Sequence, residues 1–148
     1  MGSDVEQKSG ADAPYRLDEQ VGYLLRLAVQ KHAIIFQKHA PFELTPTQFA
    51  ALVRLAHLGE CSQNELGRRT AMDVATIKGV VDRLNKKGFV QVKADPNDKR
   101  RSLLSVSDKG KGLMTTLGAA GHEISRETLK PLTAREQEVF LRLLKKLG

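Results

Sequence analysis

Between residues 62 and 106 the sequence places two helical patterns and a β-hairpin pattern in immediate succession. Ser62 opens a capping-box pattern, and the helix that follows it can span only about two turns. After a turn, Asp73 is well placed to cap a second helix, which Gly88 would end. Residues 89–106 then form two alternating stretches around the turn sequence Asp-Pro-Asn-Asp. This order predicts two helices that meet at a tight turn, followed by a hairpin.

The second of these helices has an exposed side that suits DNA. Its apolar side chains recur at helical spacing and would face a core: Ile77, Val80, Val81 and Leu84. The rest of its surface is small, polar or basic: Ala75, Thr76, Lys78, Gly79 and Arg83. Small residues allow close approach to a major groove, while Thr, Lys and Arg side chains reach base edges and phosphates. Together with the hairpin, this helix predicts a winged helix-turn-helix domain.

The tip of the hairpin carries three consecutive cations, Lys99, Arg100 and Arg101. A narrow, electronegative minor groove attracts an inserted arginine. Asp98 lies two residues before Arg100 and could hold its guanidinium in a fixed fork through charge-assisted hydrogen bonds, so that the arginine is aimed before DNA arrives. The alternative is a turn aspartate beside a solvated arginine. The flanking elements favour the DNA-binding interpretation.

Positive charge is concentrated in the middle of the chain. The formal net charge is +7, and residues 61–112 hold twelve Lys and Arg against six Asp and Glu. Such a concentration suggests a polyanionic partner, because each cation placed on a phosphate releases condensed counterions. A solvated surface would explain the same charge, so charge alone does not separate the two interpretations.

Helical patterns flank this domain on both sides. Over residues 18–39, apolar or ring side chains recur in alternating steps of four and three, as on one helix face. Thr45 opens a capping box before a helix that would end at Gly59. Ser107 can cap a long helix that runs past Leu117 to about residue 129, and a capping box at residues 133–136 opens the last helix. The chain is therefore expected to be mainly α, with a small β-hairpin wing.

Length and composition limit the class of protein. With 148 residues, of which 41% are hydrophobic and 28% charged, the chain should fold around one globular core. It has no charge-free apolar run near the roughly 18 residues of a membrane span, and its start lacks an apolar signal segment. The single cysteine, Cys61, excludes an internal disulfide. We expect a cytoplasmic protein that does not contact membranes.

The hairpin and the residues after it resemble the MarR (multiple antibiotic resistance regulator) family of winged helix-turn-helix regulators. The family's wing signature, D-x-R-x-x-x-L-x-L-T-x-x-G, is similar to the segment Asp98-x-Arg100-x-x-x-Leu104-x-Val106-Ser107-x-x-Gly110. Val106 and Ser107 depart from it, and both keep the physical role of the residue they replace. Residues 82–90 resemble the exit of the family's recognition helix. The resemblance extends from about residue 18 to residue 147.

The resemblance implies a homodimer in which the first helix and the last two helices of each chain intertwine. Residues 1–16 lack hydrophobic periodicity and are expected to form a flexible tail. The resemblance divides the rest of the chain into an N-terminal dimerisation helix at 17–44, the winged domain at 45–110 and C-terminal dimerisation helices at 111–148. The flanking segments also carry more apolar side chains than a small core can cover: Leu113, Leu117, Val139, Phe140, Leu143, Leu144 and Leu147. Two-fold symmetry predicts a palindromic operator with half-sites roughly 10 base pairs apart.

The resemblance also implies which residues contact DNA. The small, polar and basic residues of the second helix would face the major groove: Ala75, Thr76, Lys78, Gly79 and Arg83. Ser62 and Gln63 would meet the phosphate backbone, and Arg100 would enter the minor groove. Its neighbours on the wing, Asp98, Lys99 and Arg101, belong to the same expected site.

Members of the family usually release DNA when a small molecule, often an aromatic carboxylate, a phenol or a related coenzyme A thioester, binds between the dimer helices and the winged domain. To release DNA, such a ligand must have a higher affinity for the conformation whose wing spacing does not fit DNA than for the conformation whose wing spacing does. Arg26 is a candidate anion partner, His32 a candidate hydrogen-bonding ring and Phe49 a candidate pocket wall. Ordinary packing or surface ion pairing would explain each of them equally well.

Other functions find less support in the residues. A redox switch at Cys61 would need an exposed, low-pKa thiolate, and this cysteine lies beside Glu60. His32 and His39 are seven residues apart, but no cysteine or carboxylate cluster with metal-ligand spacing surrounds them, so we expect no metal site. A glycine-rich phosphate loop, a nucleophile motif and a zinc-protease helix are all missing, so we expect neither a cofactor nor an enzyme.

These observations predict a dimeric transcriptional repressor that responds to a small molecule. The first alternative is a winged-helix module for protein interaction or assembly, and a small enzyme is a distant third. Salt separates the first two, because operator binding weakens steeply as salt rises.

Overall fold

The structure is a computed structural model that describes residues 13–148. The residues expected to form a tail therefore lie largely outside the described part. Seven α-helices are α1 (Val21–His39), α2 (Pro46–Leu58), α3 (Gln63–Arg69), α4 (Val74–Lys86), α5 (Asp108–Lys111), α6 (Met114–Leu129) and α7 (Ala134–Leu147). Three strands are β1 (Glu60–Ser62), β2 (Val90–Asp95) and β3 (Asp98–Val106), and two short 3-10 turns are η1 (Leu17–Glu19) and η2 (Pro41–Glu43). The expectation of a mainly helical chain with a small hairpin wing is confirmed.

The helix starts follow from capping residues. Thr45 and Gln48 form a complete capping box at the start of α2. The Thr45 hydroxyl accepts a hydrogen bond from the Gln48 backbone N–H, and the Gln48 side chain accepts one from the Thr45 backbone N–H. Asp73 accepts a hydrogen bond from the Thr76 backbone N–H at 2.7 Å and so begins α4. At α3 only half of the expected box forms, because Ser62 caps the helix while the Glu65 carboxylate turns to two arginines farther along.

A three-stranded antiparallel sheet has the order β1-β3-β2. The hairpin is longer than the sequence predicted, because the pairing of β2 and β3 continues to Asp95 and Asp98. Sequence patterns missed β1, whose three residues are too few to show an alternation. In that strand Cys61 lies opposite Leu104. The sheet, α2, α3 and α4 enclose one apolar core, which includes Leu52, Leu66 and Leu84.

The predicted long helix after the hairpin is divided. Ser107 caps only the four-residue helix α5, its hydroxyl accepting a hydrogen bond from the Gly110 N–H at 3.0 Å. A turn at residues 112–113 separates α5 from α6. Gly110 and Gly112 both lower helix propensity here. A Cβ atom at Gly110 would also overlap the Phe89 carbonyl group and approach Val106 Cγ1 to 2.7 Å, so glycine is required where α5 packs against the hairpin.

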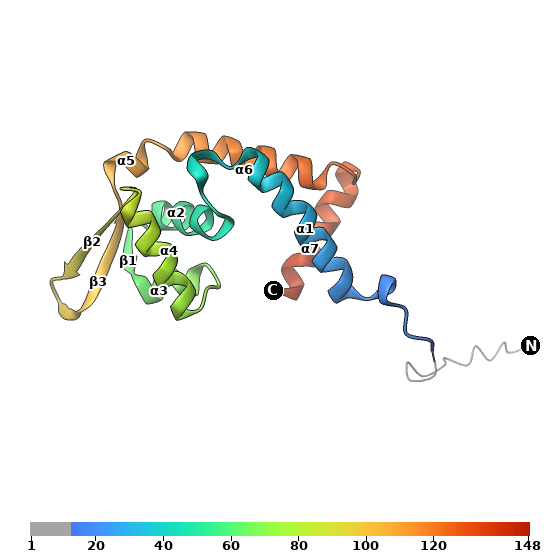
Figure 1. Cartoon of the computed structure of the whole chain (residues 1–148), viewed down its shortest axis with the longest axis horizontal. Coiled ribbons are helices and arrows are strands. Elements are labelled where there is room, and N and C mark those ends of the chain that lie inside the picture. Colours follow the sequence, from blue (N-terminus) through green and yellow to red (C-terminus); the bar gives the residue numbers. More distant parts are fainter. Residues whose placement is uncertain (1–12) are drawn as a thin grey trace, which may run out of the picture.

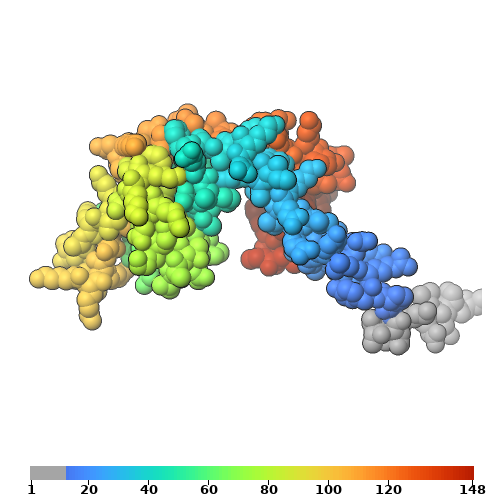
Figure 2. Space-filling model, viewed as in Figure 1, coloured from blue at the N-terminus to red at the C-terminus, as the bar shows by residue number. Residues whose placement is uncertain are grey.

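α6 joins two lobes of the molecule. Figure 1 shows the winged domain at one end of α6, and α1 with α7 at the other. Leu117, expected to contact a partner chain, is instead fully buried in the core of its own winged domain. Figure 2 shows the two lobes separated by an open hollow on the side away from α6. None of the helices in residues 13–148 combines the length and apolar character needed to cross a bilayer.

A face of α1 and α7 stays exposed and apolar. We call it the α1–α7 apolar face; it consists of Val21, Leu24, Leu25, Ala28, Phe140, Leu143, Leu144 and Leu147. Several of these side chains are at least 40% exposed, and Leu147 reaches 72%. Four of the five apolar side chains expected on α7, from Phe140 to Leu147, thus lie together with the first half of α1, whereas Val139 is half-buried and lies outside this face.

Candidate nucleic-acid interface

The surface of α4 matches the expected division into two sides. Ile77, Val80, Val81 and Leu84 are all buried in the winged core. Ala75, Thr76, Lys78 and Arg83 are exposed, and Gly79 is half-buried. The Arg83 side chain folds back over the glycine, since a Cβ at Gly79 would lie 3.1 Å from one of its guanidinium nitrogens.

Two polar residues on this surface have intrachain partners, Lys78 through its side chain and Thr76 through its backbone N–H. Lys78 Nζ lies 3.2 Å from Asp82 Oδ2, and both side chains are more than half exposed. Such a pair contributes little in water, so DNA phosphates can replace the carboxylate at small cost. Thr76 donates its backbone N–H to Asp73, and this hydrogen bond holds the pKa of Asp73 below its usual range. The cap therefore stays ionised at neutral pH and keeps the first turn of α4 in place.

The start of α3 and the wing share one polar hollow of about 230 Å³. Its lining comes from two distant segments, residues 62–64 and residues 100–102. Gln63 is half-buried there and Arg100 is 95% exposed on its side chain. Ser62 is only 6% exposed, and its hydroxyl caps α3 by accepting a hydrogen bond from the Glu65 N–H at 3.2 Å. The fold thus brings together two sets of residues that the sequence had assigned separately to DNA.

The geometry of Asp98 differs from the expected fork. Asp98 Oδ1 accepts a hydrogen bond from the backbone N–H of Arg100 at 3.0 Å, while the Arg100 Nε atom lies 3.7 Å away. The carboxylate therefore shapes the turn and attracts the guanidinium weakly. Figure 2 shows the hairpin tip projecting from the winged domain, and Lys99, Arg100 and Arg101 are all exposed. The arginine is presented to solvent without being locked in place.

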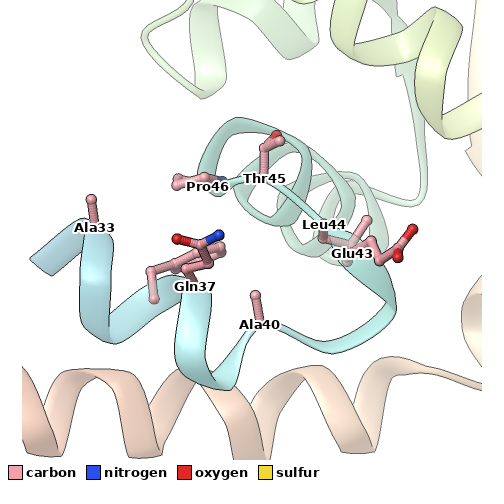
Figure 3. A pocket seen from close by; sticks show the side chains of 8 residues that line it. Ala33, Gln37, Ala40, Glu43, Leu44, Thr45 and Pro46 are labelled. Carbon is pink, nitrogen blue, oxygen red and sulfur yellow. The ribbon is translucent and has the colours of Figure 1, made fainter.

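Two cavities lie near the residues expected to bind a ligand. The α1–α2 cavity has a volume of about 580 Å³ and is lined by Ala33, Phe36, Gln37, Ala40, Glu43, Leu44, Thr45 and Pro46 (Figure 3). The α1–α6–α7 cavity measures about 330 Å³ and is lined by Leu25, Ala28, Val29, His32, Ser125, Thr128, Leu129, Phe140, Leu141 and Leu144. The second cavity shares Leu25, Ala28, Phe140 and Leu144 with the α1–α7 apolar face.

The three ligand candidates have different positions. His32 lines the α1–α6–α7 cavity, and its Nδ1 atom lies 2.9 Å from Thr128 Oγ1. Phe49 packs edge-to-face against Phe36, a lining residue of the α1–α2 cavity, with 5.7 Å between ring centroids. Arg26 lies outside the lining of both cavities, with its guanidinium 5.8 Å from the Tyr23 ring centroid.

The structure brings carboxylates to one histidine, which the sequence pattern had not indicated. Ligand atoms of His39, Glu123 and Glu127 lie within 4.8 Å of one another. The solvent-shielded Nε2 atom of His39 is 2.9 Å from Glu127 Oε1, but the geometry is not that of a hydrogen bond. His39, with Lys38, nevertheless holds the pKa of Glu127 below its usual range. Arg126 pairs with Glu123, so both carboxylates already have cationic partners.

Cys61 has the environment of a packing residue. Burial raises the pKa of its thiol, the carboxylate of Glu65 adds to this, and Arg69 opposes it. A raised pKa keeps the sulfur protonated and unreactive at neutral pH. This environment favours the protonated thiol over the thiolate that a redox switch would need.

Comparison with known proteins decides the family. The MarR family model matches residues 44–102, which contain α2, α3, α4 and most of the wing. The HTH-type transcriptional repressor NicR of Pseudomonas putida is 39% identical over 137 residues, which cover 92% of this chain and 87% of that protein. The chain belongs to the MarR family. MarR-family proteins are transcriptional regulators, so the chain is a regulator and not an enzyme.

Solved MarR-family structures share the fold over almost the whole chain. A probable transcriptional regulator from Pseudomonas aeruginosa is 52% identical, with a TM-score of 0.87 over 90% of this chain and 100% of that one. BpsR of Bordetella bronchiseptica is 36% identical, with a TM-score of 0.86 over 91% of this chain and 97% of that one. The BpsR structure is described as explaining how 6-hydroxynicotinic acid regulates DNA binding by that protein. The predicted winged helix-turn-helix is thus confirmed.

Proposed function

We propose that this MarR-family regulator is a homodimeric repressor that binds a palindromic operator and releases it when a small aromatic acid binds. The observation that carries the DNA-binding part is the shared hollow between α3 and the wing. There Gln63 lies near Arg100 and Arg101, and the helix that Gln63 begins, α3, packs against α4. One duplex could meet α4 in its major groove and the wing in the neighbouring minor groove. Because operator DNA is chromosomal, the proposal places the protein in the cytoplasm.

A second copy of the chain is the proposed cover of the α1–α7 apolar face. The face is contiguous and almost free of polar atoms, and monomeric proteins rarely expose such patches. Its helices, α1 and α7, lie at the far end of α6 from the winged domain (Figure 1). Dimerisation there would leave both winged domains free for two half-sites. The alternative, a module for protein assembly without operator binding, does not explain the cations grouped on the wing.

The α1–α6–α7 cavity is the proposed effector site. It is mainly apolar, with His32, Ser125 and Thr128 as polar lining residues, and this combination suits a flat ring with a polar substituent. It shares four lining residues with the α1–α7 apolar face, so dimerisation would help to enclose it. BpsR responds to 6-hydroxynicotinic acid. We therefore take that compound as the first probe of the effector class.

Base readout and phosphate contact should separate within α4. Thr76→Ala should relax the base preference, because it removes a hydroxyl that can reach base edges. Lys78→Ala should weaken binding to all duplexes by a similar factor and reduce the salt slope by about 1. Binding-site selection, followed by fluorescence-anisotropy titrations on the selected and a scrambled duplex, measures both. A wild-type protein that selects no sequence would refute operator binding.

A thermal-shift experiment tests the effector class. Saturating 6-hydroxynicotinic acid, at about 100 times its Kd, should stabilise the native dimer by about 2.7 kcal/mol for each occupied site. The same compound should release the selected operator duplex in an anisotropy assay, and benzoic acid serves as the unsubstituted comparison. His32→Ala should weaken both responses, while His57→Ala, at an exposed position on α2, should leave them unchanged. Stabilisation that is identical in wild type and His32→Ala would place the compound elsewhere.

A further inference from the structure

A lysine at the end of α4 holds the loop between α1 and α2. Lys87 follows the last residue of α4, and its Nζ atom donates to the carbonyl oxygens of Phe42 (3.3 Å) and Glu43 (3.0 Å). A third hydrogen bond goes to Gln48 Oε1 at 3.3 Å. An ammonium group has three N–H donors, so these contacts use all of them. A single side chain thus joins α4 to η2 and the first turn of α2.

The loop that Lys87 holds has an unusual backbone. Phe42 (φ 58°) and Glu43 (φ 55°) both adopt the left-handed conformation, which is uncommon for residues other than glycine. Such conformations persist only where the surroundings determine them. Besides the lysine contacts, the Phe42 ring makes a T-shaped contact with Phe89, with 6.1 Å between centroids. The loop is therefore fixed to the end of α4 and to the residue that precedes β2.

The same loop forms one wall of the α1–α2 cavity. Figure 3 shows the segment of Glu43, Leu44, Thr45 and Pro46 across from the helix that carries Ala33 and Gln37, and all of these residues line the cavity. A ligand or a larger side chain in this cavity would therefore contact the loop directly. The cavity also borders the proposed effector site, because Phe36 lines it and His32 lies 6.4 Å from that ring, centroid to centroid. Phe36 thus lies between His32, which lines the α1–α6–α7 cavity, and the α1–α2 cavity whose other wall is the loop.

We propose that Lys87 is a positioning residue that couples the α1–α2 cavity to the orientation of α4. The inference rests on the proposed function, since it takes α4 as the recognition helix. With its three hydrogen bonds in place, Lys87 keeps α4 in one orientation relative to the α1–α2 loop. When the loop moves, the bonds are lost and α4 can shift relative to the dimerisation helices. Small shifts of this kind change the spacing of the two wings and hence the fit to DNA.

A double-mutant cycle tests the coupling. Ala33→Leu places a larger side chain at the α1–α2 cavity, and Lys87→Met removes the ammonium group while keeping an unbranched side chain. Each single variant should lower operator affinity by about 2- to 30-fold. In the double variant the fold-loss in operator affinity should be smaller than the product of the two single losses. Without the lysine hydrogen bonds, a change in the cavity can no longer alter the orientation of α4. Independent, multiplying effects, or an Ala33→Leu variant with unchanged affinity, would overturn the proposal.

Lys86→Met is the matched control for charge. It removes an exposed cation one residue earlier, so a phosphate contact would appear as a smaller salt slope. Lys87→Met should keep the wild-type slope. Without DNA, amide hydrogen exchange at Leu44, whose N–H donates to the Pro41 carbonyl at 3.2 Å, should accelerate in Lys87→Met and not in Lys86→Met. This readout needs no operator, so a failure of the lysine contacts can be told apart from a failure of operator binding.

Discussion

Leu144→Asp should convert the protein to a monomer and reduce its operator affinity by at least about 1000-fold, to the level of non-specific binding. Leu144 is 40% exposed and lies on both the α1–α7 apolar face and the α1–α6–α7 cavity. In a two-fold symmetric dimer the substitution introduces two carboxylates. An unpaired carboxylate in apolar surroundings is strongly destabilising, so the interface should not form. A monomer then presents only half of the DNA contacts.

The oligomeric state of the variant is measured by size-exclusion chromatography with light scattering, and its DNA affinity by anisotropy. Arg142→Asp is the control, because it adds the same carboxylate two residues earlier on α7, at a position outside the α1–α7 apolar face. We expect this control to remain a dimer. If Leu144→Asp is also a dimer with wild-type affinity, another surface must form the interface.

Arg100→Ala should lower operator affinity by about 10- to 100-fold, in the range expected for the loss of an arginine that contacts a base or a narrow groove. The Arg100 side chain is 95% exposed, and its guanidinium contact with Asp98 is long, so the fold does not depend on it. Thermal unfolding and dimer stability should therefore match wild type. Lys111→Ala, an exposed cation on α5, should change affinity much less. Equal binding by Arg100→Ala and wild type would reject the proposed role of the wing.

Capping residues and hydrophobic spacing predicted most of the helices, because both depend on residues close together in the chain. Thr45, Asp73 and Thr133 all cap the helices expected of them. Local patterns failed where tertiary contacts decide the outcome. The strand β1 exists because β3 pairs with it, and the expected helix after Ser107 divides where α5 packs against Phe89.

The candidate DNA surface was predictable because α4 and the wing each have a local signature, a basic amphipathic helix and a cationic turn. Contacts between distant segments were not. No local sequence pattern predicts the contact of Lys87 with Phe42, which lies 45 residues earlier, or the contact of His39 with Glu127 on α6. Leu117 shows the same limit: its apolar side chain was expected at a dimer interface, and the turn before α6 directs it into the winged core.

Half-site spacing tests most directly the central claim that two copies of α4 and the wing bind adjacent turns of one duplex. Five extra base pairs, inserted at the centre of the selected palindrome, rotate one half-site by about half a helical turn relative to the other. We expect anisotropy titrations to show affinity falling to the non-specific level, with one dimer bound per unmodified duplex. Undiminished affinity for the five-base-pair insertion would contradict the claim.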